Sequence, residues 1–167
     1  MSMVILNTKG DTISEIGPGK TKGINIVNWN YSMKQPKVAK GKTFSFGGFT
    51  TPQLQAGKYI VKIKKGKDVF EHTIELIYDP KSTISLSERE TKQKTVMELY
   101  NMCESLAYDV YRVDAYLDYA NTSKIKKLTA KLDALKETMV ITKGDNYVGT
   151  AEPQLREKMT PQFYNPC

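Results

Sequence analysis

Histidine and cysteine are scarce in this sequence: its 167 residues include one histidine, His72, and two cysteines, Cys103 and Cys167. Two cysteines cannot form a framework of several disulfides, and a single histidine excludes the common zinc sites and most catalytic triads. No apolar run reaches the ~18 residues that a membrane-spanning helix requires. Residues 1–14 lack the basic and apolar regions of a signal peptide. We therefore predict no metal, no cofactor and no membrane span.

Arginine is absent from the first 80 residues, although the whole chain carries a net charge of +7. Residues 1–80 hold 12 lysines and 6 acidic residues, a net charge of +6, whereas residues 81–167 have a net charge of +1. Surfaces that read nucleic acids or clamp phosphates favour arginine, because its planar guanidinium bonds two acceptors at once. We therefore interpret the lysines as a solvated coat and predict no specific nucleic-acid binding. Weak binding to an anionic surface is the alternative.

The pattern of apolar residues changes near Asp79-Pro80. Before this point the apolar residues alternate with polar ones, and glycine-containing turns separate the runs, which is typical of short antiparallel strands. The predicted strands are residues 4–6, 12–16, 24–31, 43–46, 58–64 and 69–78. His72 alternates with apolar residues in the last of these strands, so we predict a partly buried strand histidine rather than a catalytic one.

After Pro80 the apolar residues follow a helical period. Ser87 and Glu90 match a capping box, with serine at the cap and glutamate three residues later. A heptad stripe then runs through Val96, Leu99, Cys103, Leu106, Val110, Val113, Leu117 and Ala120. A second stripe runs through Ile125, Leu128, Leu132, Leu135 and Met139.

The two stripes predict an antiparallel hairpin of helices at about residues 88–120 and 123–141. The second helix is too short to cover Val96 and Leu99, so these residues need another cover. The candidates are the segment near Leu155 and Met159, which predicts a short third helix, the strand domain, or another chain.

We predict the α+β fold class: a small antiparallel Ig/FnIII-like β-sandwich followed by an antiparallel helical hairpin or a short three-helix bundle. The predicted domains are residues 1–80 and residues 81–167.

Tyrosine placement is the feature that points to an interaction. Tyr108, Tyr111 and Tyr119 form a second stripe on the first helix, away from its heptad stripe, and a two-helix hairpin would leave them in water. Tyrosine is favoured at interfaces because it is large, rigid and polar at its tip. We predict that these tyrosines, together with Val96 and Leu99, pack on another domain or on a partner. The alternative is that a third helix covers them.

Four stretches carry a resemblance to a known family: Lys-Gly-Asp-Thr-Ile at residues 9–13, the run ending in Trp29-Asn30, Gly-Lys-Tyr-Ile-Val within residues 55–63, and Asp79-Pro80. In this order they resemble the C-terminal region of bacterial BNR/sortilin-type β-propeller proteins, in which related patterns precede a helical segment. The resemblance covers about residues 4–160. Three positions depart from it, since Asn30 stands in place of Asp, Ala56 in place of Pro, and Lys81 in place of Arg.

The resemblance implies an accessory region of a periplasmic or extracellular protein, with a β-propeller as its neighbouring domain. The propeller itself lies outside these residues, so any activity of the propeller would not be carried here. From these features we predict a non-catalytic accessory module, not an enzyme, that binds a neighbouring domain or a partner protein or dimerises through its helices. The alternative is a carbohydrate- or other ligand-binding module that stacks ligands on Trp29, Tyr31 or Phe46.

Overall fold

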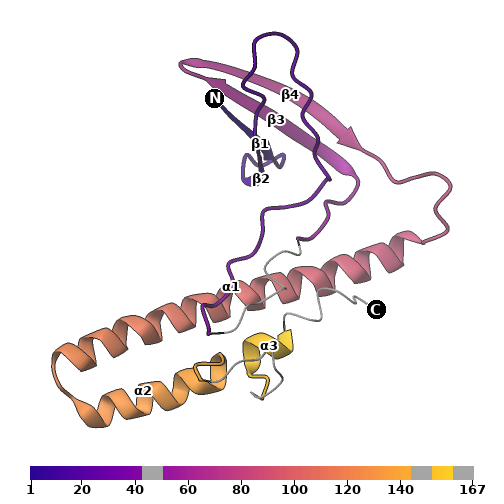
Figure 1. Ribbon diagram of the computed structural model, residues 1–167. Helices are drawn as coiled ribbons and strands as arrows, with labels where there is room; N and C mark the ends of the chain where they lie inside the picture. The colour runs from indigo at the N-terminus through magenta and orange to yellow at the C-terminus, as the bar shows by residue number, and fades with distance from the viewer. Residues whose placement is uncertain (43–50, 144–151, 160–167) are drawn as a thin grey trace. The chain divides into compact units, whose positions relative to one another are not determined.

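The computed structural model describes residues 1–42, 51–143 and 152–159, in which four strands precede three helices (Figure 1). The chain divides into two compact units. The first consists of Met1–Lys34 and Thr51–Arg89, and the second of the described parts of Gln35–Thr50 and Glu90–Cys167. The predicted α+β class is confirmed. The second unit also takes in residues 35–42, which precede the third strand in the chain.

One antiparallel sheet has the strand order β2-β1-β3-β4. Its strands are β1 (Ser2–Leu6), β2 (Thr12–Ile16), β3 (Gly57–Lys65) and β4 (Asp68–Leu76). The side chain of Asn7 closes the β1–β2 turn, because its Oδ1 accepts hydrogen bonds from the backbone N–H groups of Lys9 and Asp11, both at 2.9 Å. Gly66 closes the β3–β4 hairpin with φ of +61°, a conformation that favours glycine. Both predicted hairpins are confirmed.

One face of the sheet is apolar, and its burial decreases from β1 to β4. The register places Met3 opposite Ile63, and Ile63 opposite Phe70, so these side chains share a face. Ile5 on the same face is fully buried, whereas Phe70 is 58% exposed. Among the described residues there is no second sheet that would complete a sandwich. The predicted strand at residues 43–46 lies outside them.

The predicted strand at residues 24–31 is wrong. This segment has no strand structure, and Ile24 and Ile26 are 95% and 88% exposed. The side chain of Asn25 instead bonds to the chain near it: its Oδ1 accepts hydrogen bonds from the Thr21 hydroxyl and backbone N–H, and its Nδ2 donates to the Thr21 carbonyl. Such local side-chain bonds compete with the hydrogen-bond ladder of a sheet. The alternation of apolar residues here was therefore misleading.

The first helix, α1 (Leu86–Thr122), begins with a capping box, but not at the predicted serine. The Glu88 backbone N–H donates to the Ser85 Oγ at 3.3 Å, and the Ser85 backbone N–H donates to the Glu88 carboxylate at 2.8 Å. The Ser85 hydroxyl also donates to the Glu88 carboxylate, at 2.7 Å, and this bond together with that of the Ser85 backbone N–H lowers the pKa of Glu88. The same S-x-x-E pattern occurs at Ser87, and the sequence could not distinguish the two. The predicted cap at Ser87 is wrong by two residues.

The predicted helical hairpin is confirmed by the second helix, α2 (Lys126–Met139). We call the buried residues of α1 the core stripe: Tyr100, Cys103, Leu106, Val110, Val113, Leu117 and Ala120. On α2, Leu132 and Met139 are half-buried. Lys136 joins the helices, since its Nζ lies 2.5 Å from the Asp114 Oδ1. Lys136 thus takes an inward position, and two leucines of the predicted α2 stripe, Leu128 and Leu135, are 37% and 45% exposed.

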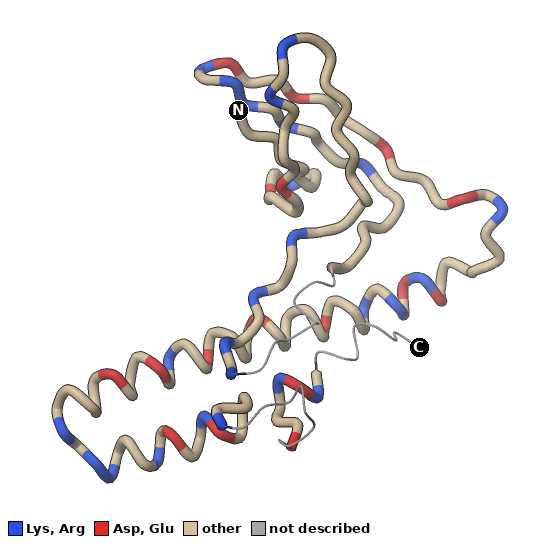
Figure 2. Tube along the Cα trace, viewed as in Figure 1, with Lys and Arg blue, Asp and Glu red and all other residues tan. Residues whose placement is uncertain are grey.

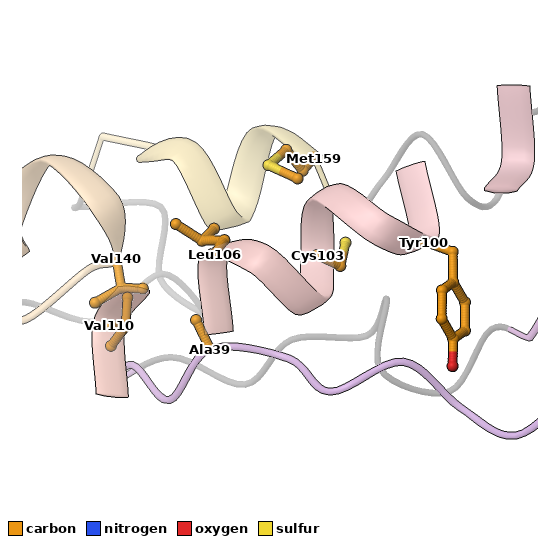
Figure 3. Close-up of a cluster of buried hydrophobic side chains, with 7 residues drawn as sticks. All are labelled: Ala39, Tyr100, Cys103, Leu106, Val110, Val140 and Met159. Atoms are coloured by element: carbon orange, nitrogen blue, oxygen red, sulfur yellow. The ribbon is translucent and has the colours of Figure 1, made fainter. Parts of the chain in front are cut away.

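A hydrophobic cluster covers the part of α1 that α2 is too short to reach. Ala39, from the segment before the helices, and Met159, from the short helix α3 (Leu155–Met159), pack with Cys103 and its neighbours (Figure 3). Val96 and Leu99 are partly buried against this cluster. Residues far apart in the chain therefore complete the core of the second unit.

The buried side chain of Arg156 joins α3 to residues 39–41 and forms an ion pair within α3. The Arg156 Nε donates to the Glu157 Oε1 at 2.6 Å, and the Arg156 Nη1 donates to the Ala39 carbonyl at 3.1 Å. The side chains of Arg156 and Glu157 are only 3% and 7% exposed. A Cβ on Gly41 would lie 2.7 Å from the guanidinium carbon, so glycine at this position allows the chain to approach Arg156 closely.

Candidate functional site

Four tyrosines on α1 form an exposed surface. Tyr108, Tyr111, Tyr116 and Tyr119 are between 54% and 69% exposed. A helix has about 3.6 residues per turn, which places Tyr108, Tyr111 and Tyr119 on the side of α1 opposite the core stripe. Large exposed aromatic side chains that lie together on one face are a recognised mark of an interaction site. We call these four tyrosines, together with Arg112, the tyrosine surface.

Arg112 holds the centre of the tyrosine surface. Its guanidinium carbon lies 5.8 Å from the centre of the Tyr108 ring, within the range of a cation–π contact. The pKa of Arg112 is raised mainly by a hydrogen bond with the side chain of Tyr116, and the negative charge of Asp109 raises it further. Just over two turns of helix, from Tyr108 to Tyr116, thus present a cation between two aromatic rings. The interface residues predicted from the sequence did not include Arg112, although its spacing of four residues from both Tyr108 and Tyr116 indicates this contact.

Acidic residues flank the tyrosine surface. Asp109 and Asp118 are exposed and lie within one turn of its tyrosines along α1. From residue 98 to residue 122, α1 carries five acidic residues and one arginine. Figure 2 shows these acidic positions in red along the helix and the lysines of α2 in blue. The surface therefore has aromatic rings and one arginine at its centre and acidic residues around it.

The other two predicted interface residues lie elsewhere. Val96 and Leu99 are half-buried and pack against the cluster that includes Ala39 and Met159. They are not on the exposed side of α1 that carries the tyrosines. The structure thus separates the predicted interface residues into three exposed tyrosines and two apolar residues that contribute to the core.

The predicted ligand-stacking residues do not form a flat platform. The rings of Trp29 and Tyr31 meet edge to face, with centres 5.4 Å apart and planes at 61°. The Trp29 indole N–H donates to the Ser32 carbonyl at 3.2 Å, so its polar edge already has a partner in the chain. Tyr31 is 55% exposed. Phe46 lies outside the described residues.

The titratable groups that could perform chemistry are dispersed. His72 is exposed on β4, so the predicted partial burial is wrong. It lies opposite Val61, but β4 is an edge strand, where the face of the sheet is least buried. Burial raises the pKa of the Cys103 thiol, which disfavours the reactive thiolate. In residues 1–42, 51–143 and 152–159, no group of three or more His, Cys, Asp or Glu side chains could hold a metal ion.

In the same described part of the chain, no helix is both long and apolar enough to cross a membrane. Comparisons with protein-family models, with curated proteins and with solved structures gave no match. The description of the protein therefore rests on its own structure. The described residues form an α+β chain with a four-stranded antiparallel sheet, a helical hairpin and an exposed tyrosine surface on the longer helix.

Proposed function

We propose that the chain is a non-catalytic interaction module and that the tyrosine surface of α1 binds a protein partner. The exposure of four neighbouring tyrosines on one helix is the observation that carries this proposal. Tyrosine and arginine are enriched among the residues that dominate binding energy at protein interfaces. The rings would lose water on binding, while their hydroxyls and the Arg112 guanidinium could still form hydrogen bonds.

The proposal also assigns a role to the sheet, which is to pack against another part of a larger protein. Its half-covered apolar face, with Phe70 exposed at one side, is where the second sheet of an Ig-like sandwich would pack. The resemblance to the C-terminal region of BNR/sortilin-type propeller proteins supports an Ig-like accessory module. It also supports a periplasmic or extracellular location beside a β-propeller. In this arrangement the sheet would face a neighbouring domain, and the tyrosine surface would remain available to a partner.

A photo-cross-linking experiment tests the proposed function. The full chain carries benzoylphenylalanine in place of Tyr111 or, as a matched control, in place of Tyr31, which is also more than half exposed. Both variants are produced in the cells that normally make the protein and are irradiated there. We expect a discrete cross-linked product from position 111 and none from position 31. The proposal is wrong if position 111 gives no product, or if both positions give the same products.

A further inference from the structure

We infer that the tyrosine surface binds the outer side of α2 in a second copy of this chain. This inference rests on the proposed function and names its partner. The outer side of α2 presents two half-exposed leucines beside two exposed lysines, and we call these four residues the lysine–leucine ridge: Lys127, Leu128, Lys131 and Leu135. Leu128 and Leu135 lie three and four residues from Lys131, and Lys127 lies four residues before it, so all four are on one side of the helix.

Charge is the first argument for this pairing. Around the tyrosine surface α1 is acidic, with Asp109 and Asp118 beside the tyrosines, whereas residues 124–139 carry five lysines and two acidic residues. Within one chain, α1 and α2 already join through an ion pair of Asp114 with Lys136. The contact between copies would repeat this arrangement on the outer sides of the same two helices. Opposite charges at facing positions also select the partner and its register.

Shape gives the second argument. The tyrosine surface spans residues 108–119, about 16 Å along α1, and the ridge spans residues 127–135, about 12 Å along α2, at ~1.5 Å per residue. Both are therefore about three turns or less in length and can lie along each other. Leu128 and Leu135 would supply aliphatic side chains to the tyrosine rings, and the lysine stems would cover their edges.

The tyrosine surface is a poorer match for itself. Two copies paired face to face through α1 would bring together Asp109 and Asp118 from each chain, two acids for every arginine. Like charges at such positions oppose association. Pairing α1 with α2 avoids this conflict and is heterologous, because each copy uses one surface to bind and offers a different surface to the next. The contact is smaller than those of permanent dimers, so we expect a reversible association that depends on protein concentration.

Two charge-reversal variants of the full chain test this inference. One variant carries Asp109→Lys and Asp118→Lys, which makes α1 basic around the tyrosines. The other carries Lys127→Glu and Lys131→Glu, which makes the ridge acidic. All four positions are exposed, and circular dichroism checks that both variants keep their helices. Sedimentation equilibrium then measures the average mass over a range of concentrations.

We expect the mass of the natural chain to rise with concentration and to rise less at high salt. Each variant alone should remain monomeric, because its two surfaces then carry the same sign of charge. An equimolar mixture should associate again, because the basic α1 of one variant matches the acidic ridge of the other.

Two results would overturn the inference. If the ridge variant associates as the natural chain does, the lysine–leucine ridge is not the surface that the second copy offers. If the natural chain and the mixture stay monomeric while position 111 cross-links to a different protein, the proposed function stands and the partner is not a second copy. Failure of cross-linking from position 111 would instead remove the proposed function itself.

Discussion

Replacing Arg156 with methionine is expected to lower the free energy of unfolding by about 3–5 kcal/mol, the cost of removing one member of a buried ion pair. The change would leave the Glu157 carboxylate buried without the guanidinium, and it would remove the hydrogen bond that the Ala39 carbonyl accepts. The first loss destabilises α3 itself, and the second weakens its attachment to residues 39–41. Urea unfolding followed by circular dichroism measures the effect.

A double variant and a surface pair serve as controls. Arg156→Met with Glu157→Leu removes both charges, and because an apolar pair can replace a buried ion pair, most of the lost stability should return. The exposed pair of Lys143 with Glu137 provides the matched comparison, and Lys143→Ala should leave the free energy of unfolding almost unchanged. Equal effects of Arg156→Met and Lys143→Ala would show that the buried contacts of Arg156 do not stabilise the second unit.

Replacing Leu106 with alanine is expected to cost about 2–5 kcal/mol, because the change leaves a cavity in the core of the second unit. Leu106 is buried in the cluster that joins α1, residue Ala39 and Met159 of α3 (Figure 3). The surrounding side chains come from three separate stretches of the chain, so they cannot all move to fill the space. Chemical unfolding of the purified chain gives the difference.

Leu135→Ala is the matched control for this change. Leu135 is 45% exposed on α2, so the same substitution there removes few buried contacts and should cost less than about 1 kcal/mol. A similar loss at both positions would contradict the assignment of Leu106 to the core and of Leu135 to the outer side of α2.

The elements that local patterns specify were predicted well. The heptad stripe from Cys103 to Ala120 recurs as the buried side of α1, because a period of three and four residues leaves one helix face to bury. The turns at Asn7–Asp11 and Gly66 were predicted because asparagine and glycine favour tight turns. These features depend on residues close together in the chain.

The errors arose where short-range patterns compete. Residues 24–31 alternate as a strand would, but the hydrogen bonds of the Asn25 side chain hold the segment in another conformation. Two serines, Ser85 and Ser87, each precede a glutamate by three residues, and only the contacts reveal that Ser85 is the cap. On α2, Lys136 takes an inward position and forms an ion pair with Asp114, and a count of apolar residues does not include such a contact.

The arrangement around Arg156 could not be predicted, because its partners are distant in sequence. Ala39 and Gly41 lie more than a hundred residues before Arg156, and nothing in their local sequence indicates that they meet it. The tyrosine surface could be predicted only in part. The spacing of Tyr108, Tyr111 and Tyr119 predicted a separate stripe, while their exposure required the structure.

Radical footprinting of tyrosines tests the central claim, that the tyrosine surface is covered by a protein partner, most directly. Hydroxyl radicals modify exposed tyrosine rings, and mass spectrometry compares the modification of Tyr108, Tyr111 and Tyr119 in the cells that make the protein with that in the dilute purified chain. Tyr31, which is 55% exposed in the first unit, is the internal reference. We expect the three α1 tyrosines to be protected in cells and Tyr31 to be modified equally in both samples. Equal modification of the α1 tyrosines in both samples would contradict the account.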